Sequence, residues 1–150
     1  DRSGALNYLE QIVTQFPGSP KIPAIMLRQG ELLSEMARAE EAREKYQYIL
    51  RVPEWRGVLH ARALYQIGES YMAEDAYAKA HGFYERTFLG YPHLAEWSAR
   101  AYLADAKALI GMGEMQDAIN TLNEAVVEIS ASAPADILKS IKAKLKELQG

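Results

Sequence analysis

The chain has 150 residues, 49% of them hydrophobic and 25% charged, which is an ordinary composition for one globular domain with a buried core. Its formal net charge is −3, and acidic and basic residues are interspersed, so no basic stripe is available to neutralise the phosphates of a nucleic acid. The absence of cysteine excludes disulfides and thiolate zinc sites, and no apolar run approaches the roughly 20 residues that span a bilayer.

The pattern of residues 1–18 predicts a single helix. It resembles the second helix of each of the helix pairs that are predicted further along the chain. Its apolar side is formed by Leu6, Leu9, Ile12 and Val13. Because the first helix of this unit is absent, we interpret the sequence as a piece of a longer chain. We expect the apolar side to be exposed and to cause weak self-association, which light scattering over a range of concentrations would detect.

Residues 19–54 predict a pair of helices. Ser19 is the expected N-cap of the first helix, and Pro20 and Pro23 fall in or near its first turn, where proline costs least. Apolar and small residues then recur on one face: Met26, Leu27, Gly30, Leu33 and Ala37. The second helix is expected over 39–50 and ends before Pro53, which disfavours helical geometry in the preceding residue.

Two further pairs are predicted in residues 55–92 and 93–130. Their helices are expected over 55–73 and 76–89, and then over 94–110 and 115–129. The tripeptide Gly111-Met112-Gly113 between the last two helices superficially resembles a phosphate-binding loop. It follows a helix rather than a strand, so we interpret it as a helix–helix turn, where glycine tolerates left-handed geometry.

A last helix is predicted over 134–149, after a linker of small residues. Its apolar stripe is formed by Ile137, Leu138, Ile141, Leu145 and Leu148. We expect this stripe to pack on Leu122, Val126 and Ile129 of the preceding helix as a C-terminal cap, with the lysines outward.

The predicted pairs repeat at a nearly fixed period. Four alanines lie 37, 38 and 38 residues apart: Ala5, Ala42, Ala80 and Ala118. A large apolar residue follows each alanine by four positions: Leu9, Tyr46, Tyr84 and Leu122. A small residue precedes the last three alanines at the same period: Gly30, Gly68 and Ala106. We expect these small residues to lie opposite the alanines so that two helices can approach closely, and the large residues to fill the space between pairs.

This pattern resembles the tetratricopeptide repeat. The copy in residues 55–92 carries the family's motif best: Leu64, Ile67-Gly68, Tyr71, Ala80, Tyr84 and Pro92. The resemblance implies an all-α fold, a right-handed superhelical solenoid of antiparallel helix pairs with about eight helices. It also implies a non-catalytic scaffold that binds a protein or peptide.

The period of 37–38 residues is longer than the 34 residues usual in that family. Together with the segment Phe16-Pro17-Gly18-Ser19-Pro20, it is similar to the repeats of bacterial envelope proteins, such as the lipoprotein subunit of the outer-membrane barrel-assembly machine and the periplasmic coordinator of the Tol–Pal system. The resemblance therefore implies a periplasmic or outer-membrane-associated protein rather than a cytoplasmic one.

In tetratricopeptide proteins the first helix of each pair lines a concave groove. The residues at the corresponding positions are the candidate partner-binding residues: Leu27, Glu31, Arg62, Tyr65, Glu69, Met72, Arg100, Leu103, Lys107 and Ile110. Some members of the family clamp a C-terminal carboxylate with Lys and Asn, but Leu27, Tyr65 and Leu103 stand where the first Lys would be, which argues against such a clamp. The alternative that these ten are ordinary solvated residues stays open.

No catalytic, cofactor-binding or metal-binding constellation is recognisable in the sequence. His60, His81 and His93 are too far apart for two ligands on one helix face, and we expect all three to be solvated. Two functions stay open: an interaction scaffold, or a regulatory module attached to an enzyme domain elsewhere in the parent chain. The parent sequence would distinguish them, because a lipoprotein signal favours the first and a fused catalytic domain the second.

Overall fold

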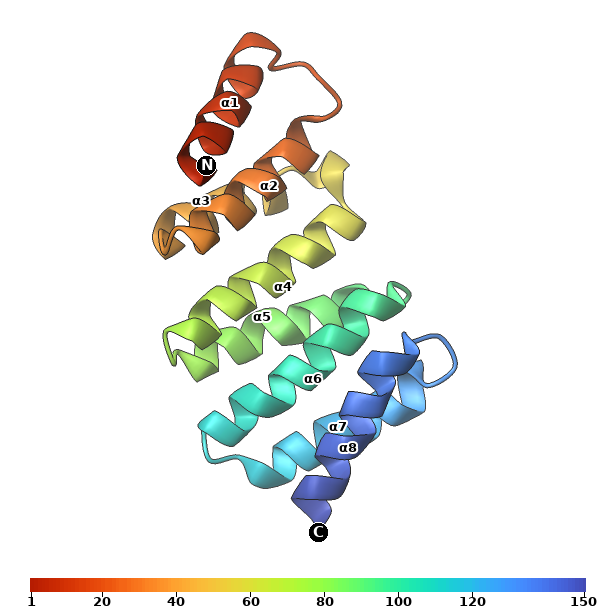
Figure 1. The fold of residues 1–150 in the computed structure, drawn as a ribbon. Coiled ribbons are helices and arrows are strands. Elements are labelled where there is room, and N and C mark those ends of the chain that lie inside the picture. The colour runs from red at the N-terminus through yellow and green to blue at the C-terminus, as the bar shows by residue number, and fades with distance from the viewer. The chain divides into compact units, whose positions relative to one another are not determined.

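The computed structural model describes residues 1–150 and contains eight α-helices, one short 3-10 helix and no strand (Figure 1). The all-helical fold is therefore confirmed. Contacts divide the chain into two compact units, residues 1–63 and 64–150, with the boundary inside one helix. The predicted division into one half repeat and three full repeats stays a prediction. None of the helices is both long and apolar enough to cross a membrane.

The first unit is built on one helix pair. It contains α1 (Arg2–Gln15), α2 (Ile22–Glu35), α3 (Ala39–Leu50), the 3-10 helix η1 (Pro53–Trp55) and the first turns of α4 (Val58–Ala73). The pair is formed by α2 and α3, and α1 packs on α2. The observed bounds of α3 are those predicted from the sequence.

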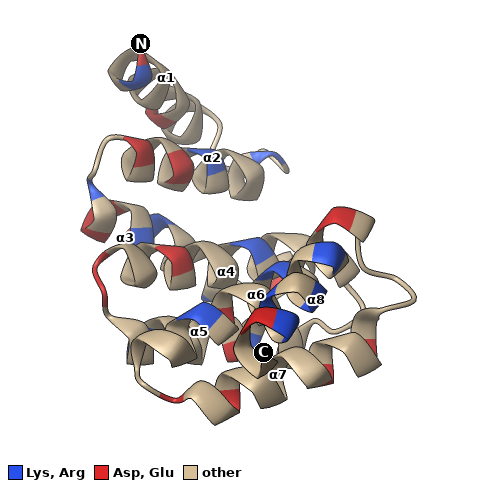
Figure 2. Ribbon diagram, turned by 60° about the horizontal axis from the view of Figure 1, so that its bottom comes forward, with Lys and Arg blue, Asp and Glu red and all other residues tan.

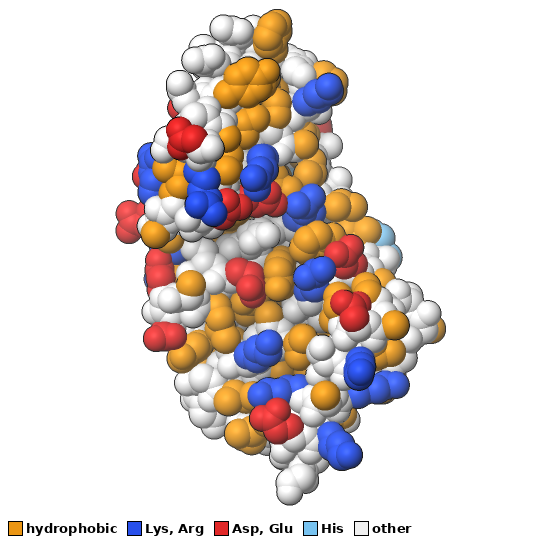
Figure 3. Space-filling view, viewed as in Figure 1, with side chains coloured by type: hydrophobic (Ala, Val, Ile, Leu, Met, Phe, Trp, Pro, Cys, Tyr) orange, Lys and Arg blue, Asp and Glu red, His pale blue; other side chains and the backbone are white.

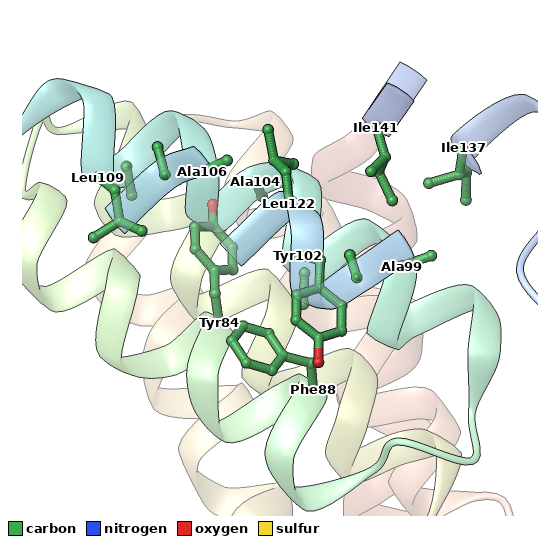
Figure 4. Close-up of a cluster of buried hydrophobic side chains, with 14 of the residues drawn as sticks. Tyr84, Phe88, Ala99, Tyr102, Ala104, Ala106, Leu109, Leu122, Ile137 and Ile141 are labelled. Carbon is green, nitrogen blue, oxygen red and sulfur yellow. The ribbon is translucent and has the colours of Figure 1, made fainter. Parts of the chain in front are cut away.

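The second unit contains the remainder of α4 with α5 (Tyr77–Gly90), α6 (Ala95–Gly111), α7 (Met115–Ile129) and α8 (Ala135–Gln149). Helix α6 packs on both α5 and α7. Its buried residues are mostly alanines, whose small side chains allow close contact with two neighbouring helices. The core formed by α5–α8 is shown in Figure 4, where Tyr84, Phe88 and Tyr102 lie beside Leu122 and the small side chains of α6.

Tyrosine rings fill the space that the repeated glycines leave open. A Cβ atom built on Gly68 would lie 2.6 Å from Cε1 of Tyr84, and one built on Gly30 would clash in the same way with the ring of Tyr46. Both tyrosines are fully buried. The predicted close approach is thus present, but the expected partner was wrong: each glycine faces the tyrosine of its own pair, not the alanine.

The turn between the two helices of each pair has the same backbone geometry. The residues Ala37, Asp75 and Gly113, which are 38 positions apart, have φ values of 60°, 56° and 82°. After each of them a backbone N–H reaches back across the helix end: Arg38 to Leu33, Ala76 to Tyr71 and Glu114 to Leu109, all at 2.9 Å between N and O. This is the Schellman arrangement that closes helices with a left-handed residue. Placing Ala37 on the apolar helix face was therefore wrong.

Ala37→Gly is expected to raise the free energy of unfolding by about 1 kcal/mol, because an alanine in the left-handed region carries a steric cost that glycine avoids. The side chain of Ala37 is exposed, so no packing is lost. Urea denaturation followed by circular dichroism measures the change. Ala24→Gly, at an exposed position in the first turn of α2, is the control and should lower stability by up to about 1 kcal/mol. A loss of stability in both variants would contradict the argument.

Two expectations about the N-terminal segments are corrected. Helix α2 begins at Ile22 without a side-chain cap, and the hydroxyl of Ser19 instead accepts the N–H of Lys21 within the preceding turn. In α1, Leu6 is only 6% exposed because the helix packs on α2. The exposed large side chains are Tyr8 in this helix and Phe16 at its C-cap. Weak self-association stays a prediction, now with these two aromatic residues as its candidates.

Helix α8 packs against the core of the second unit, and its role as a C-terminal cap of the repeats stays a prediction. Ile137 and Ile141 join the core that includes Leu122 and Ile129, with Val126 and Leu145 packed against it. The lysines Lys139, Lys142 and Lys146 are exposed, and Figure 2 shows the basic segments of α8 in blue. Beyond the expected contact with α7, α8 also packs on α6, which brings its first turn to the site described next.

Candidate functional site

Helices α4, α5, α6 and α8 of the second unit enclose a hollow with a volume of about 300 Å³. Six of the candidate groove residues line it: Tyr65, Glu69, Met72, Arg100, Leu103 and Lys107. The sequence did not predict five others: Tyr84, Ala104, Asp136, Ile137 and Ser140. Three of these belong to the first two turns of α8, which forms one wall of the hollow. The candidate residues were chosen only from the first helices of the pairs, so they did not include this wall.

Aromatic rings form one side of the hollow. The ring of Tyr65 lies between those of Tyr84 and Trp97, with centroid distances of 5.9 and 5.8 Å. Burial raises the pKa of Tyr65 to about 12, and the neighbouring carboxylate of Glu69 adds to this effect. Because tilted aromatic pairs hold rings in fixed orientations, Tyr65 presents a rigid, partly exposed surface to the hollow.

The carboxylate of Glu69 is held by the aromatic cluster. The hydroxyl of Tyr84 donates a hydrogen bond of 2.5 Å to it. Burial raises the pKa of Tyr84 far above its usual value, and this hydrogen bond raises it further, so the hydroxyl keeps its proton. Glu69 is thus a positioned acceptor at the edge of the hollow.

Charges of both signs surround the aromatic residues. Arg100 pairs with Glu96 at 3.1 Å and lies over the ring of Trp97 at 5.5 Å. Lys107 and Asp136 are exposed and their side chains make no ion pair or hydrogen bond. The face of the molecule over α6 and α8 accordingly shows acidic and basic side chains among apolar ones (Figure 3). These two unpaired charges are available to a ligand.

The other four candidate residues do not line this hollow. Leu27 is 3% exposed in the core of the first unit, so its placement in a groove was wrong. Glu31 accepts from Arg62 at 3.0 Å and from Arg28 at 3.2 Å in that same unit. Ile110 is half-buried and packs against the core of the second unit.

The expectation that all three histidines are solvated was wrong for two of them. His60 is 5% exposed, and its Nε2 atom lies 3.0 Å from the carbonyl oxygen of Val52. His81 is half-buried and bridges two carboxylates, with Nδ1 2.6 Å from Asp105 and Nε2 2.9 Å from Glu85. Only His93 is exposed.

The bridge from Asp105 to His81 joins α6 to α5 in the core. Asp105 is fully buried, and one of its oxygens has no hydrogen-bond partner. Burial raises the pKa of Asp105 to about 6, although the hydrogen bond from His81 opposes this rise. Since both ring nitrogens of His81 are engaged by carboxylates, we assign the bridge a structural role. No three acidic or histidine side chains converge where they could share a metal ion.

Comparison with known proteins identifies the fold. No protein-family model matches the chain, and no curated protein sequence does. Five solved chains match in structure. One, described as "MamA RS-1 ArsTM double mutant", has a TM-score of 0.65 and 18% sequence identity, over 99% of this chain and 85% of that one. At this identity the match shows the fold alone, a helical fold similar to that of tetratricopeptide repeats.

Proposed function

We propose that the chain is a non-catalytic scaffold whose second unit binds a peptide segment of a protein partner in the hollow between α4, α5, α6 and α8. The observation that carries this proposal is the convergence of six candidate groove residues with the first turns of α8 on one concave surface. Tyrosine, methionine and arginine, which are enriched in the cores of protein interfaces, are all among them.

The lining indicates what kind of peptide fits. An apolar side chain of the partner would rest on Tyr65, Leu103 and Ile137, because these present carbon surface to the hollow. Lys107 and Asp136 hold charges of opposite sign without partners, so an acidic and a basic residue beside the apolar anchor would fix the register of the peptide. The expected ligand is an apolar residue flanked by charges of both signs.

Tyr65→Ala is expected to weaken peptide binding at least about tenfold, because truncating an aromatic anchor in an interface core costs roughly 2 kcal/mol. Peptides would be selected from a random display library on the wild-type protein, and their affinities for the variants measured by fluorescence anisotropy. Circular dichroism would verify that helicity is unchanged.

The matched control is Tyr71→Ala. Tyr71 lies on the same helix, is also half-buried and packs against the same core, but does not line the hollow. Its truncation should leave peptide affinity within about twofold, since contacts outside the centre of an interface contribute little. Equal losses in the two variants, or no loss in Tyr65→Ala, would refute binding in this hollow.

We infer a bacterial envelope location only from the 37–38-residue period and the proline-rich closures of the second helices. A signal sequence or lipid-attachment site at the start of the parent chain would support this location. A parent chain without any export signal would contradict it.

A further inference from the structure

A second hollow lies on the second unit between α5, α6 and α7, with a volume of about 160 Å³. It shares no lining residue with the peptide site proposed above. Its apolar wall includes Phe88 and Tyr102, whose rings stack with a centroid distance of 4.0 Å and an interplanar angle of 13° (Figure 4). Its polar groups are Ser98, Glu124 and Glu128.

The hydroxyl of Ser98 is an unsatisfied buried group at this hollow. Ser98 is 0% exposed, and its Oγ atom has no hydrogen-bond partner. Leaving a buried hydroxyl unpaired is costly because its desolvation is not repaid, so native proteins rarely do so. Ser98 lines the hollow, so its unpaired hydroxyl can accept a hydrogen bond from a donor placed there.

The repeat explains why the space is open. Ser98 stands 38 positions after His60, at the corresponding position of the next repeat. The imidazole of His60 is buried and reaches the carbonyl oxygen of Val52. A serine side chain is smaller than a histidine side chain, so the chain's own residue fills less volume at position 98 than at position 60.

The charge around the hollow is negative. Glu124 and Glu128 lie one turn apart on α7, and neither forms an ion pair. The hydroxyl of Tyr102 donates to Glu124 at 3.4 Å. Burial, together with the two nearby carboxylates, raises the pKa of Tyr102 to about 12. No Lys or Arg lines the hollow, so a cation would find two uncompensated acceptors there.

We propose that this hollow binds the ammonium group of a lysine side chain from a protein partner. The aliphatic stem contacts the rings of Phe88 and Tyr102, and the ammonium donates to Ser98, Glu124 and Glu128. An ammonium group has three donors on a compact cation, which suits three acceptors, whereas a guanidinium has five donors in a planar fork. The volume of about 160 Å³ suits a single side chain.

The test is an NMR titration of the ¹⁵N-labelled protein with Nα-acetyl-lysine methylamide. We expect saturable shifts of the backbone amides of Ser98, Tyr102 and Glu124. Nα-acetyl-norleucine methylamide, which has the stem without the ammonium group, should bind at least about tenfold more weakly, since hydrogen bonds to charged groups contribute most of the affinity. Equal binding of the two compounds, or no saturable shift with the lysine compound, would overturn the proposal.

Three variants make the test specific. Ser98→His restores the side chain found one repeat earlier and should abolish binding by filling the hollow. Glu124→Gln combined with Glu128→Gln changes only exposed side chains and should weaken binding at least about tenfold even if Ser98→His fails to fold. Tyr65→Ala should leave it unchanged, which separates this site from the peptide site. Unchanged binding in the glutamine variant would refute the site.

A final arm distinguishes the source of the ammonium group. Butane-1,4-diamine carries the same group without a peptide backbone. We expect it to bind no more tightly than the lysine compound. Tighter binding of the diamine would overturn the assignment to a partner's lysine in favour of a free amine.

Discussion

Gly68→Leu is expected to lower the free energy of unfolding by about 1–3 kcal/mol or more, among the largest effects of any single substitution in this chain. The reason is geometric, because even a Cβ atom at this position would lie 2.6 Å from the ring of Tyr84. That ring cannot move aside easily, since it is fully buried and its hydroxyl is held by Glu69. Chemical denaturation of the variant and the wild type measures the difference.

The control is Gly82→Ala in α5. A Cβ atom there would meet nothing within 4 Å, so this change should stabilise the helix by about 1 kcal/mol. A second variant tests the pairing itself: Tyr84→Leu should recover part of the loss caused by Gly68→Ala. Ala106 and Leu122, both fully buried, already show this combination one repeat later. If Gly68→Leu and Gly82→Ala changed stability alike, the proposed glycine–tyrosine contact would be wrong.

Stability is expected to fall as the pH rises from about 4 to about 6, by up to about 3 kcal/mol from Asp105 alone. Burial raises the pKa of Asp105 from 3.8 to about 6 in the folded chain. Between these values the unfolded chain has released the proton and the folded chain retains it, so the folded state binds more protons and loses stability with rising pH. The groups that face Asp105 are His81, Glu85 and Tyr84, all on α5.

Asp105→Asn isolates this contribution, because an amide of the same shape does not titrate. The free energy of unfolding would be measured in urea from pH 4 to pH 7 for both proteins. We expect the variant to be less dependent on pH, and more stable than the wild type above pH 6 if its amide still bonds to His81. Parallel pH profiles for the two proteins would show that Asp105 titrates near its usual value.

The periodic parts of the fold were predictable from the sequence. The bounds of α3 and α7 were predicted to the residue, because proline, glycine and the apolar period act locally on a helix. The glycine at position 113 likewise indicated its turn, since glycine is the residue that favours left-handed geometry. Six residues of the candidate hollow could be chosen because they stand at corresponding repeat positions on α4 and α6, which both line it.

What could not be predicted depends on contacts between distant segments. Ala37 adopts left-handed geometry because its neighbours complete a Schellman turn, although alanine by itself favours a helix. The sequence also did not indicate that His81 meets Asp105, because these residues are 24 positions apart on different helices. The first turns of α8 belong to the candidate hollow because α8 packs on α6, a contact that the amphipathic stripe alone does not specify.

The matched sizes at the repeated contact restrict how such units can be recombined. Gly68 and Tyr84 form one fitted set in the pair of α4 and α5. Ala106 and Leu122 stand at the corresponding positions of the next helix pair, α6 and α7, and form a second set. A crossover inside a pair would join the first helix of one pair to the second helix of the other pair. This would place a tyrosine against an alanine, or a leucine against a glycine. The first hybrid would be overfilled and the second would contain a void. If the chain is instead divided in the connection before α6 and whole pairs are exchanged, each fitted set stays together. Duplication or grafting of whole pairs is therefore expected to preserve the packing.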